Sequence, residues 1–318
     1  MSLPTVIMTA VVRSAHQGDS HGGVYLVDLE RGTWRQTIDW NDGSIEWEGR
    51  GGDRGLRGIA FHGDEIFIAA SNEVFVYDRD FRRKRSFGNR YLGLCHEIAI
   101  AHGRLYLTST AFDSVLVYDI AAERFVVGYC IKVGQIPDPA TGKPTRRIGF
   151  GAFDPESPSG PPRQDTSHIN NVYVDAAGRL YVCGVNLDQI LVIEDGRITP
   201  FARVPLWTHN ARPFRGGTLA NCTGSDALVF MDRAGRPQVS FPVPRYDPAV
   251  LRNTDLPQDH ARQAFARGMC LLDDNTVAVG SSPATVTVFR LDPPAQLKTV
   301  NLTLDVRNAV HGLAVWPF

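Results

Sequence analysis

Residues 311–318 read HGLAVWPF, a short apolar segment that opens with a histidine and a glycine. The same pattern occurs closely at residues 57–61 (RGIAF) and more loosely at residues 96–100 (HEIAI) and 267–271 (RGMCL). Each internal copy is followed by a tight turn and further strand-like segments, whereas the last copy can be completed only by the N-terminal segment 6–12. We therefore expect the last strand to complete the first sheet, which closes a ring of repeats and removes exposed strand edges.

A unit of four strands repeats along the chain with a period of about 50 residues. Its strands are rich in Val, Ile, Tyr and Phe and are separated by Gly, Asp and Asn turns, and residues 103–106 and 178–181 both read GRLY. The first unit combines the C-terminal strand with residues 6–12, 24–28 and 33–40, and the others span residues 57–87, 96–129, 170–204, 209–242 and 268–303. This pattern predicts an all-β fold: a single domain over residues 1–318 that forms a six-bladed β-propeller with four antiparallel strands in each blade.

The composition restricts the partners and the compartment. The formal net charge is −1, which argues against a nucleic-acid or anionic-membrane partner. No apolar run is long enough to span a membrane, and the N-terminal segment lacks the basic region and long apolar core of a signal peptide. We expect a cytoplasmic protein that binds a small molecule, and the oligomeric state is left open. The five cysteines include no CxxC spacing and predict buried, reduced thiols.

Loop length differs between the two faces of the predicted propeller. The links between first and second strands and between third and fourth strands are short, as at residues 62–64. The opposite face, called the loop face below, holds nearly all the extra length. Residues 131–167 and 243–266 form long loops over it, and the first of these, with Arg146 and Arg147, is expected to cover the channel mouth as an ordered lid. Long loops on a rigid scaffold usually carry binding and catalysis, so we expect function on the loop face.

Polar residues open the inner strands and would surround the channel mouth on the loop face. Those that are histidines come from four different blades: His96, His168, His209 and His311. Neutral imidazoles bind Zn, Fe, Cu or Mn, so these histidines are candidate ligands of a divalent transition metal. The structural alternative is that each histidine bonds a carbonyl of the neighbouring blade in a water-filled channel, and no compact ligand motif such as HExxH decides between the two.

Charged and amide side chains at neighbouring positions complete the predicted site. Arg57 and Arg267 open two further inner strands and would hold a carboxylate or phosphate of the substrate. Glu97 is a candidate general base or outer partner of the metal. The residues expected to bind substrate are Asn170, Asn210 and Arg212.

The unit formed by an opener, a short turn, GRLY and then the strand VLVYD resembles the blades of six-bladed propellers of the NHL and gluconolactonase-like type. The resemblance covers nearly the whole chain, but its motifs are general to the architecture, so it implies the fold and assigns no activity. In the gluconolactonase-like group a metal is held by a Glu, Asn and Asp set. Of that set this sequence offers Glu97 and Asn170, with different flanking residues.

These features predict a metal-dependent enzyme that acts on a small polar or anionic substrate at the channel mouth. A lyase or a hydrolase is the first hypothesis, and an oxygenase is the second. The competing class is a non-catalytic propeller that docks a peptide or protein partner on the loop face. The two classes differ in what the histidines do, because an enzyme should lose activity without them and a scaffold should tolerate their replacement by alanine.

Overall fold

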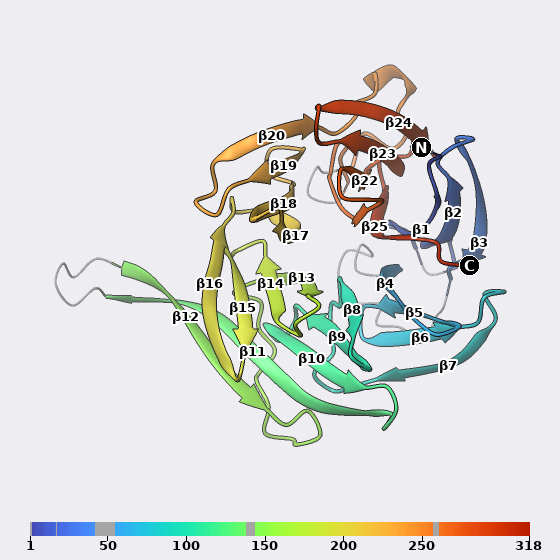
Figure 1. Cartoon of the computed structure of the whole chain (residues 1–318). Helices are drawn as coiled ribbons and strands as arrows, with labels where there is room; N and C mark the ends of the chain where they lie inside the picture. The colour runs from blue at the N-terminus through green and yellow to red at the C-terminus, as the bar shows by residue number, and fades with distance from the viewer. Residues whose placement is uncertain (1, 17, 42–54, 138–143, 257–260) are drawn as a thin grey trace.

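The computed structural model describes residues 2–16, 18–41, 55–137, 144–256 and 261–318. These residues form six antiparallel sheets arranged as blades around a central axis (Figure 1). The predicted six-bladed β-propeller is therefore confirmed. None of the described segments forms a helix that is long and apolar enough to cross a membrane.

The strands of each blade follow one another from the axis outward. The first blade contains β25 (Asn308–Val315), β1 (Thr5–Val12), β2 (Gly22–Asp28) and β3 (Thr33–Asp39). The second contains β4 (Leu56–His62), β5 (Glu65–Ala70), β6 (Glu73–Tyr77) and β7 (Arg83–Gly88). The third contains β8 (Ile98–Ala101), β9 (Arg104–Ser109), β10 (Ser114–Asp119), β11 (Arg124–Pro137) and β12 (Pro144–Phe153).

The remaining three blades have four strands each. The fourth contains β13 (Ile169–Val174), β14 (Leu180–Gly184), β15 (Gln189–Glu194) and β16 (Arg197–Arg203). The fifth contains β17 (Thr208–Phe214), β18 (Gly217–Cys222), β19 (Ala227–Met231) and β20 (Pro237–Pro242). The sixth contains β21 (Met269–Leu271), β22 (Thr276–Ser281), β23 (Thr285–Arg290) and β24 (Ala295–Asn301).

The hydrophobic core lies between neighbouring blades. The middle strands β5 and β10 are almost entirely buried, because both faces of each sheet pack against another blade, whereas the outer strand β7 is exposed or half-buried. One core cluster contains both Phe67 of the second blade and Leu107 of the third. Another contains Ile7 of the first blade and Ile68 of the second. Packing of this kind holds the six inner strands around the axis.

The ring closes as the sequence predicts. The C-terminal strand β25 pairs antiparallel with β1, from Val6 opposite Val315 to Val12 opposite Asn308. Gly312 N–H donates to Thr9 Oγ1 at 2.8 Å, and the Thr9 hydroxyl donates to the carbonyl of Arg57 in the second blade. The two ends of the chain thus complete one blade and link it to the next.

The third blade departs from the predicted four strands. Residues expected in a lid continue β11 to Pro137 and return as β12, a fifth strand that pairs with β11 from Gly128 opposite Phe153 outward. This hairpin projects beyond the perimeter of the ring (Figure 1), so its described part does not cover the channel mouth. Arg146 and Arg147 pair with β11 there. Residues 138–143 of the predicted lid lie outside the described residues.

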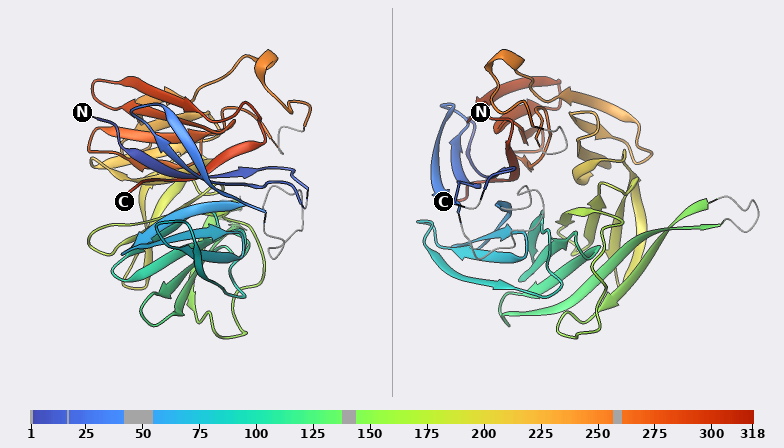
Figure 2. Two further views of the ribbon diagram at one scale, coloured as in Figure 1. Left: turned by 90° about the vertical axis from the view of Figure 1, so that its right-hand side faces the viewer. Right: turned by 180° about the vertical axis from the view of Figure 1, so that it is seen from behind.

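The second long loop lies on the loop face beside the sixth blade. It contains the short 3-10 helix η1 (Pro248–Val250), and it projects from the face opposite the chain termini (Figure 2, left). Ala264 N–H donates to the carbonyl of Ser282 at 2.6 Å. The backbone at Arg252 forms an isolated parallel β-bridge with that at Asp305. These bonds fix the described part of the loop, and residues 257–260 lie outside it.

A glycine follows three of the openers because the inner strands of neighbouring blades approach closely there. A Cβ atom on Gly58 would lie 2.6 Å from the backbone nitrogen of Ile98, in the third blade. A Cβ atom on Gly268 would lie 2.9 Å from the carbonyl oxygen of His311, and one on Gly312 would lie 2.3 Å from that of Arg57. The recurring polar-glycine pair is thus a consequence of strand crowding around the axis.

Replacing Gly312 by alanine should therefore loosen the ring closure. We expect Gly312→Ala to lower the free energy of unfolding by about 1–3 kcal/mol, because the new methyl group has to displace backbone of the second blade. Gly134→Ala is the matched control, since Gly134 also lies in a strand but has open space where the methyl group would go. Denaturant unfolding of the two variants measures the difference, and equal losses would contradict the crowding argument.

Candidate functional site

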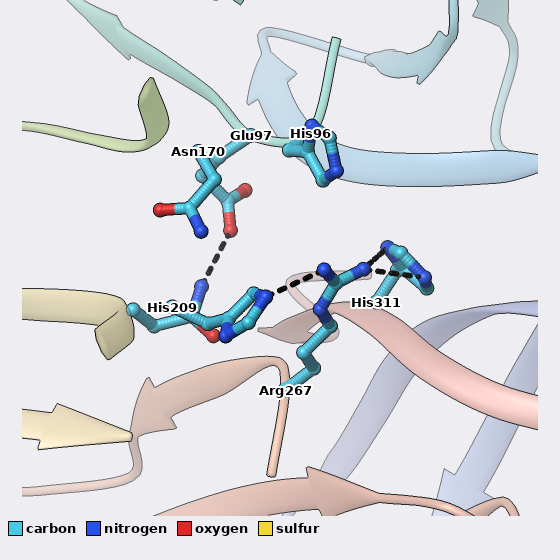
Figure 3. A pocket seen from close by; sticks show the side chains of 7 residues that line it. His96, Glu97, Asn170, His209, Arg267 and His311 are labelled. Carbon is cyan, nitrogen blue, oxygen red and sulfur yellow. Dashed lines mark hydrogen bonds between the residues drawn. The ribbon is translucent and has the colours of Figure 1, made fainter. Parts of the chain in front are cut away.

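The loop-face ends of the inner strands converge on one small cavity at the axis (Figure 3). Its volume is about 10 Å³, which is room for roughly one water molecule. All of its lining residues are polar: His96, Glu97, Asn170, His209, Asn210, Arg267 and His311. The structure thus brings together, from five blades, most of the side chains that the sequence singles out.

Extra residues in the inner strands aim these side chains at the axis. The pairing register shifts between Ile169 and Asn171 and between Thr208 and Asn210, which leaves Asn170 and His209 as extra residues in their strands. Similar shifts occur where β4 passes Arg57 and where β25 passes His311. β-Bulges of this kind redirect side chains and are common beside active sites.

Arg267 occupies the centre of the cavity between two histidines (Figure 3). Its Nη2 donates to His209 Nε2 at 2.6 Å, and its Nη1 lies 3.0 Å from Nε2 and 3.2 Å from Nδ1 of His311. A guanidinium group can only donate hydrogen bonds, so His209 accepts this bond on an unprotonated Nε2. The arginine therefore uses the lone pair that a metal ion would need.

The three cavity histidines are held in the neutral state. Burial lowers the pKa of His96, His209 and His311 well below 6.5, and the positive charge of Arg267 lowers each of them further. His96 directs Nδ1 to the carbonyl of Leu94 at 2.6 Å, which places its proton on Nδ1 and leaves Nε2 as an acceptor. At neutral pH each of these uncharged imidazoles can donate a hydrogen bond from one ring nitrogen and accept one on the other.

Glu97 is the carboxyl group of the cavity. Burial raises its pKa to about 8, against the hydrogen bond that the N–H of Ile98 donates to Oε1 at 3.3 Å. Asn210 Nδ2 donates to Glu97 Oε2 at 3.2 Å, and Asn210 Oδ1 accepts from the N–H of Gly268 at 2.9 Å. Glu97 is thus mainly protonated at neutral pH, and Asn210 is fully engaged in holding it.

Asn170 differs from its neighbours. Its side chain is only 2% exposed, and neither Nδ2 nor Oδ1 has a hydrogen-bond partner in the structure. The adjacent Asn171, by contrast, donates from Nδ2 to the carbonyl of Ala211 at 2.7 Å. Asn170 therefore offers an unused donor and an unused acceptor to the cavity.

His168 lies at the edge of the site beside the cavity. Its ring is 5.5 Å from that of His96, and its Nδ1 bonds Asp165 Oδ2 at 2.8 Å. The backbone of His168 has a left-handed φ of 50°, a conformation that bulky residues adopt mainly where the surroundings impose it. Asp113 holds the segment just before His168 by accepting from the N–H groups of Thr166 and Ser167. Asp165 was not predicted, although it lies three residues before a predicted histidine.

Further guanidinium groups surround the cavity. Arg57 is 1% exposed, donates to the carbonyl of Cys95 at 3.4 Å, and lowers the pKa of His96 and His311. Arg13 lies 4.4 Å from the ring centroid of Phe265, and Arg267 lies 4.9 Å from the same centroid. Arg13 and Phe265 were not predicted, since both belong to links that do not repeat. Three guanidinium groups thus lie in or beside the cavity.

Arg212 is placed elsewhere than the sequence predicts. Its guanidinium lies 4.3 Å from the ring centroid of Tyr173, so the side chain packs between the fourth and fifth blades and does not line the cavity. Within the described ranges, no group of three or more His, Cys, Asp or Glu side chains is arranged to hold a metal ion. The predicted set of four histidine ligands does not fit this geometry, because Arg267 already bonds His209 and contacts His311.

No protein-family model and no curated protein matches the chain. Among solved structures, a protein of unknown function from Bacteroides caccae has a TM-score of 0.54 at 9% identity and covers 98% of both chains. A catalytically inactive virginiamycin B lyase from Staphylococcus aureus, solved with quinupristin, has a TM-score of 0.46 at 12% identity and covers 77% of this chain and 70% of its own. A streptogramin B lyase has a TM-score of 0.41 at 12% identity, covering 75% and 70%. At these identities the comparisons concern the fold alone, and the NHL and gluconolactonase-like resemblance stays a prediction.

Glu97 should make the stability of the protein depend on pH. Its pKa is raised from an ordinary 4.5 to about 8 in the folded state, so between these values the unfolded chain loses a proton that the folded chain keeps. Its contribution is therefore complete below pH 4.5 and is lost as the pH rises toward 8, by an amount on the order of a few kcal/mol.

Glu97→Gln removes this titration. We expect the variant to gain stability relative to the wild type as the pH rises from 5 to 8, as measured by denaturant unfolding at several pH values. Glu194→Gln, at the exposed end of β15, is the control for removing a carboxyl group. A difference between wild type and Glu97→Gln that stays constant over this range would refute the raised pKa.

Proposed function

We propose that this protein is an enzyme that binds a small anionic substrate at the channel mouth and acts on it by acid–base chemistry, as a lyase or a hydrolase. The observation that supports this is the combination of one guanidinium group, three neutral imidazoles and one protonated carboxyl group around a single cavity. Fixed positive charge in a buried site attracts an anion, and a carboxyl group whose pKa is raised to about 8 can donate a proton near neutral pH.

The arginines bind the anionic group of the substrate. The guanidinium of Arg267 lies in the cavity, and Arg57 and Arg13 lie close enough to lower the pKa of His311. A carboxylate accepts two parallel hydrogen bonds from a guanidinium, which is a stronger arrangement than its present bonds to neutral imidazoles. We infer that Arg267 exchanges its histidine partners for the substrate carboxylate, which also enlarges the cavity.

Proton transfer is divided between two groups. His168 has its Nδ1 proton oriented toward Asp165, which leaves Nε2 as the basic atom, as in catalytic histidines that are positioned by a carboxylate. Glu97 keeps its proton at neutral pH and serves as the acid. A base and an acid close to an anion-binding group suit both abstraction of a proton next to a carboxylate and attack by water.

Metal dependence is the second candidate. His96 and His168 both direct Nδ1 to an oxygen acceptor, which is the usual orientation of metal-binding histidines. A metal ion would find Nε2 of His96 together with the oxygen atoms of Glu97 and Asn170, and it would polarise a substrate carbonyl or activate water. The positive charge of Arg267 would repel a metal ion bound at this position.

Turnover tests the proposed function. Incubation with small carboxylates that carry a β-leaving group, an ester or an amide, followed by NMR of the products, should identify a reaction. We expect Arg267→Leu and His168→Ala to reduce the rate by about 100-fold or more, because each removes a group that acts on the reacting substrate. Asp165→Asn should reduce it similarly while the protein stays folded.

Matched surface variants control for non-specific effects. Arg124→Leu and His62→Ala make the same replacements at exposed positions on the face opposite the loop face, and they should leave the rate unchanged. Unchanged turnover in Arg267→Leu would refute the assigned role. Binding of carboxylates without any turnover would favour the non-catalytic propeller.

Metal binding should respond to Arg267 in a defined direction. We expect Arg267→Leu to bind Zn²⁺ or Mn²⁺ at least about 10-fold more tightly than the wild type, because it frees the imidazoles of His209 and His311 and removes a positive charge. Elemental analysis and calorimetry of protein without a histidine tag measure this. One transition metal per chain in the wild type, lost in His96→Ala, would instead establish the metal-dependent candidate.

A further inference from the structure

Among the described side chains that line the cavity, Asn170 is the one with no hydrogen bond inside the protein, and a ligand could supply the missing partners. Buried amide groups are nearly always paired, and leaving both a donor and an acceptor unpaired is unfavourable. Asn170 is 2% exposed, and both of its amide atoms lack a partner. The same cavity satisfies Asn210 on both atoms, so the condition of Asn170 is not a general property of this channel.

The two unpaired amide atoms of Asn170 determine which chemical group could form hydrogen bonds with both of them. A carboxamide presents an N–H donor and a carbonyl acceptor in one plane on the same edge. Its complement is another group with a carbonyl and an N–H on one edge, which is a primary carboxamide or a lactam. An ester or a ketone pairs only with the N–H donor of Asn170. A carboxylate also pairs only with that donor, and it would place its negative charge beside the amide oxygen of Asn170.

We propose that Asn170 recognises a primary carboxamide or lactam group of the substrate, so that the enzyme acts on small carboxylates that carry such a group. The inference rests on the proposed function, in which Arg267 binds the carboxylate. Asn170 and Arg267 line the same cavity, so one small molecule can reach both of them (Figure 3). The present volume of about 10 Å³ admits the group only after the guanidinium of Arg267 has moved toward the carboxylate.

Glu97 strengthens this selection. Its carboxyl group lines the same cavity as Asn170. Asn210 holds Glu97 Oε2, so the orientation of the carboxyl group is set before the substrate enters. Preorganised polar groups that stay unpaired with the wrong ligand are an effective basis for specificity.

The test compares two probes of equal shape and charge. Succinamate and levulinate differ only in an amide NH₂ in place of a methyl group, and both carry one carboxylate. Calorimetric titration at neutral pH should show succinamate binding about 10- to 100-fold more tightly to the wild type, because levulinate leaves the acceptor of Asn170 unpaired. Asn170→Leu should bind the two probes equally, and Arg267→Leu should lose affinity for both.

Each other outcome has a definite meaning. Equal affinities in the wild type, or a preference that persists in Asn170→Leu, would overturn the amide assignment while leaving the carboxylate site of the proposed function intact; water or a cation then satisfies Asn170. Failure of both probes to bind up to their solubility would overturn both proposals. Asn186→Leu, on the same face but outside the cavity, is the control variant. The comparison of probes on the wild type stands even where Asn170→Leu does not fold.

Discussion

The close approach of the inner strands around the axis is the constraint on which the rest of the structure depends. At Gly58, Gly268 and Gly312 a side chain would meet backbone of the neighbouring blade. Glycine permits this spacing in three of the blades, and one of the three, Gly312, lies where the last strand pairs beside the first to close the ring. The polar residue before each glycine is carried to the same place, so crowding of the backbone and assembly of the site have one cause.

Burial at the loop-face ends of the inner strands determines the charge of the imidazole and carboxyl groups there. Imidazole and carboxyl groups can respond to low polarity by becoming neutral, and His96, His209, His311 and Glu97 do so. Arginine keeps its charge in the same surroundings, because its pKa is too high for burial to neutralise it. The outcome is positive charge surrounded by neutral hydrogen-bonding groups. The anionic substrate proposed above matches this arrangement, whereas a bound cation would be repelled by Arg267.

The sequence predicts the parts of this structure that repeat and misses the parts that do not. The openers could be found because the repeat places one in each blade at the same register. Arg13, Asp165 and Phe265 belong to links of unequal length, which no periodicity describes. The region 131–167 was expected to be a loop because of its Pro and Gly content, yet ladder pairing of β11 with β12 overrides that local preference. Arg212 was expected to bind substrate, although its side chain lies over Tyr173.

The bulges explain why sequence alone could locate the site but not its chemistry. In a regular strand neighbouring side chains point to opposite faces, so His209 and Asn210 should not both reach one cavity. The extra residue at His209 breaks this alternation, and both side chains line the cavity. The extra residue at Asn170 likewise turns an amide away from the bonds that hold Asn171. The unpaired amide of Asn170 arises from such a local shift in register, which leaves no mark in composition or spacing. The chemical character of the site is therefore a property of strand pairing, and the fold has to be known before the ligand can be inferred.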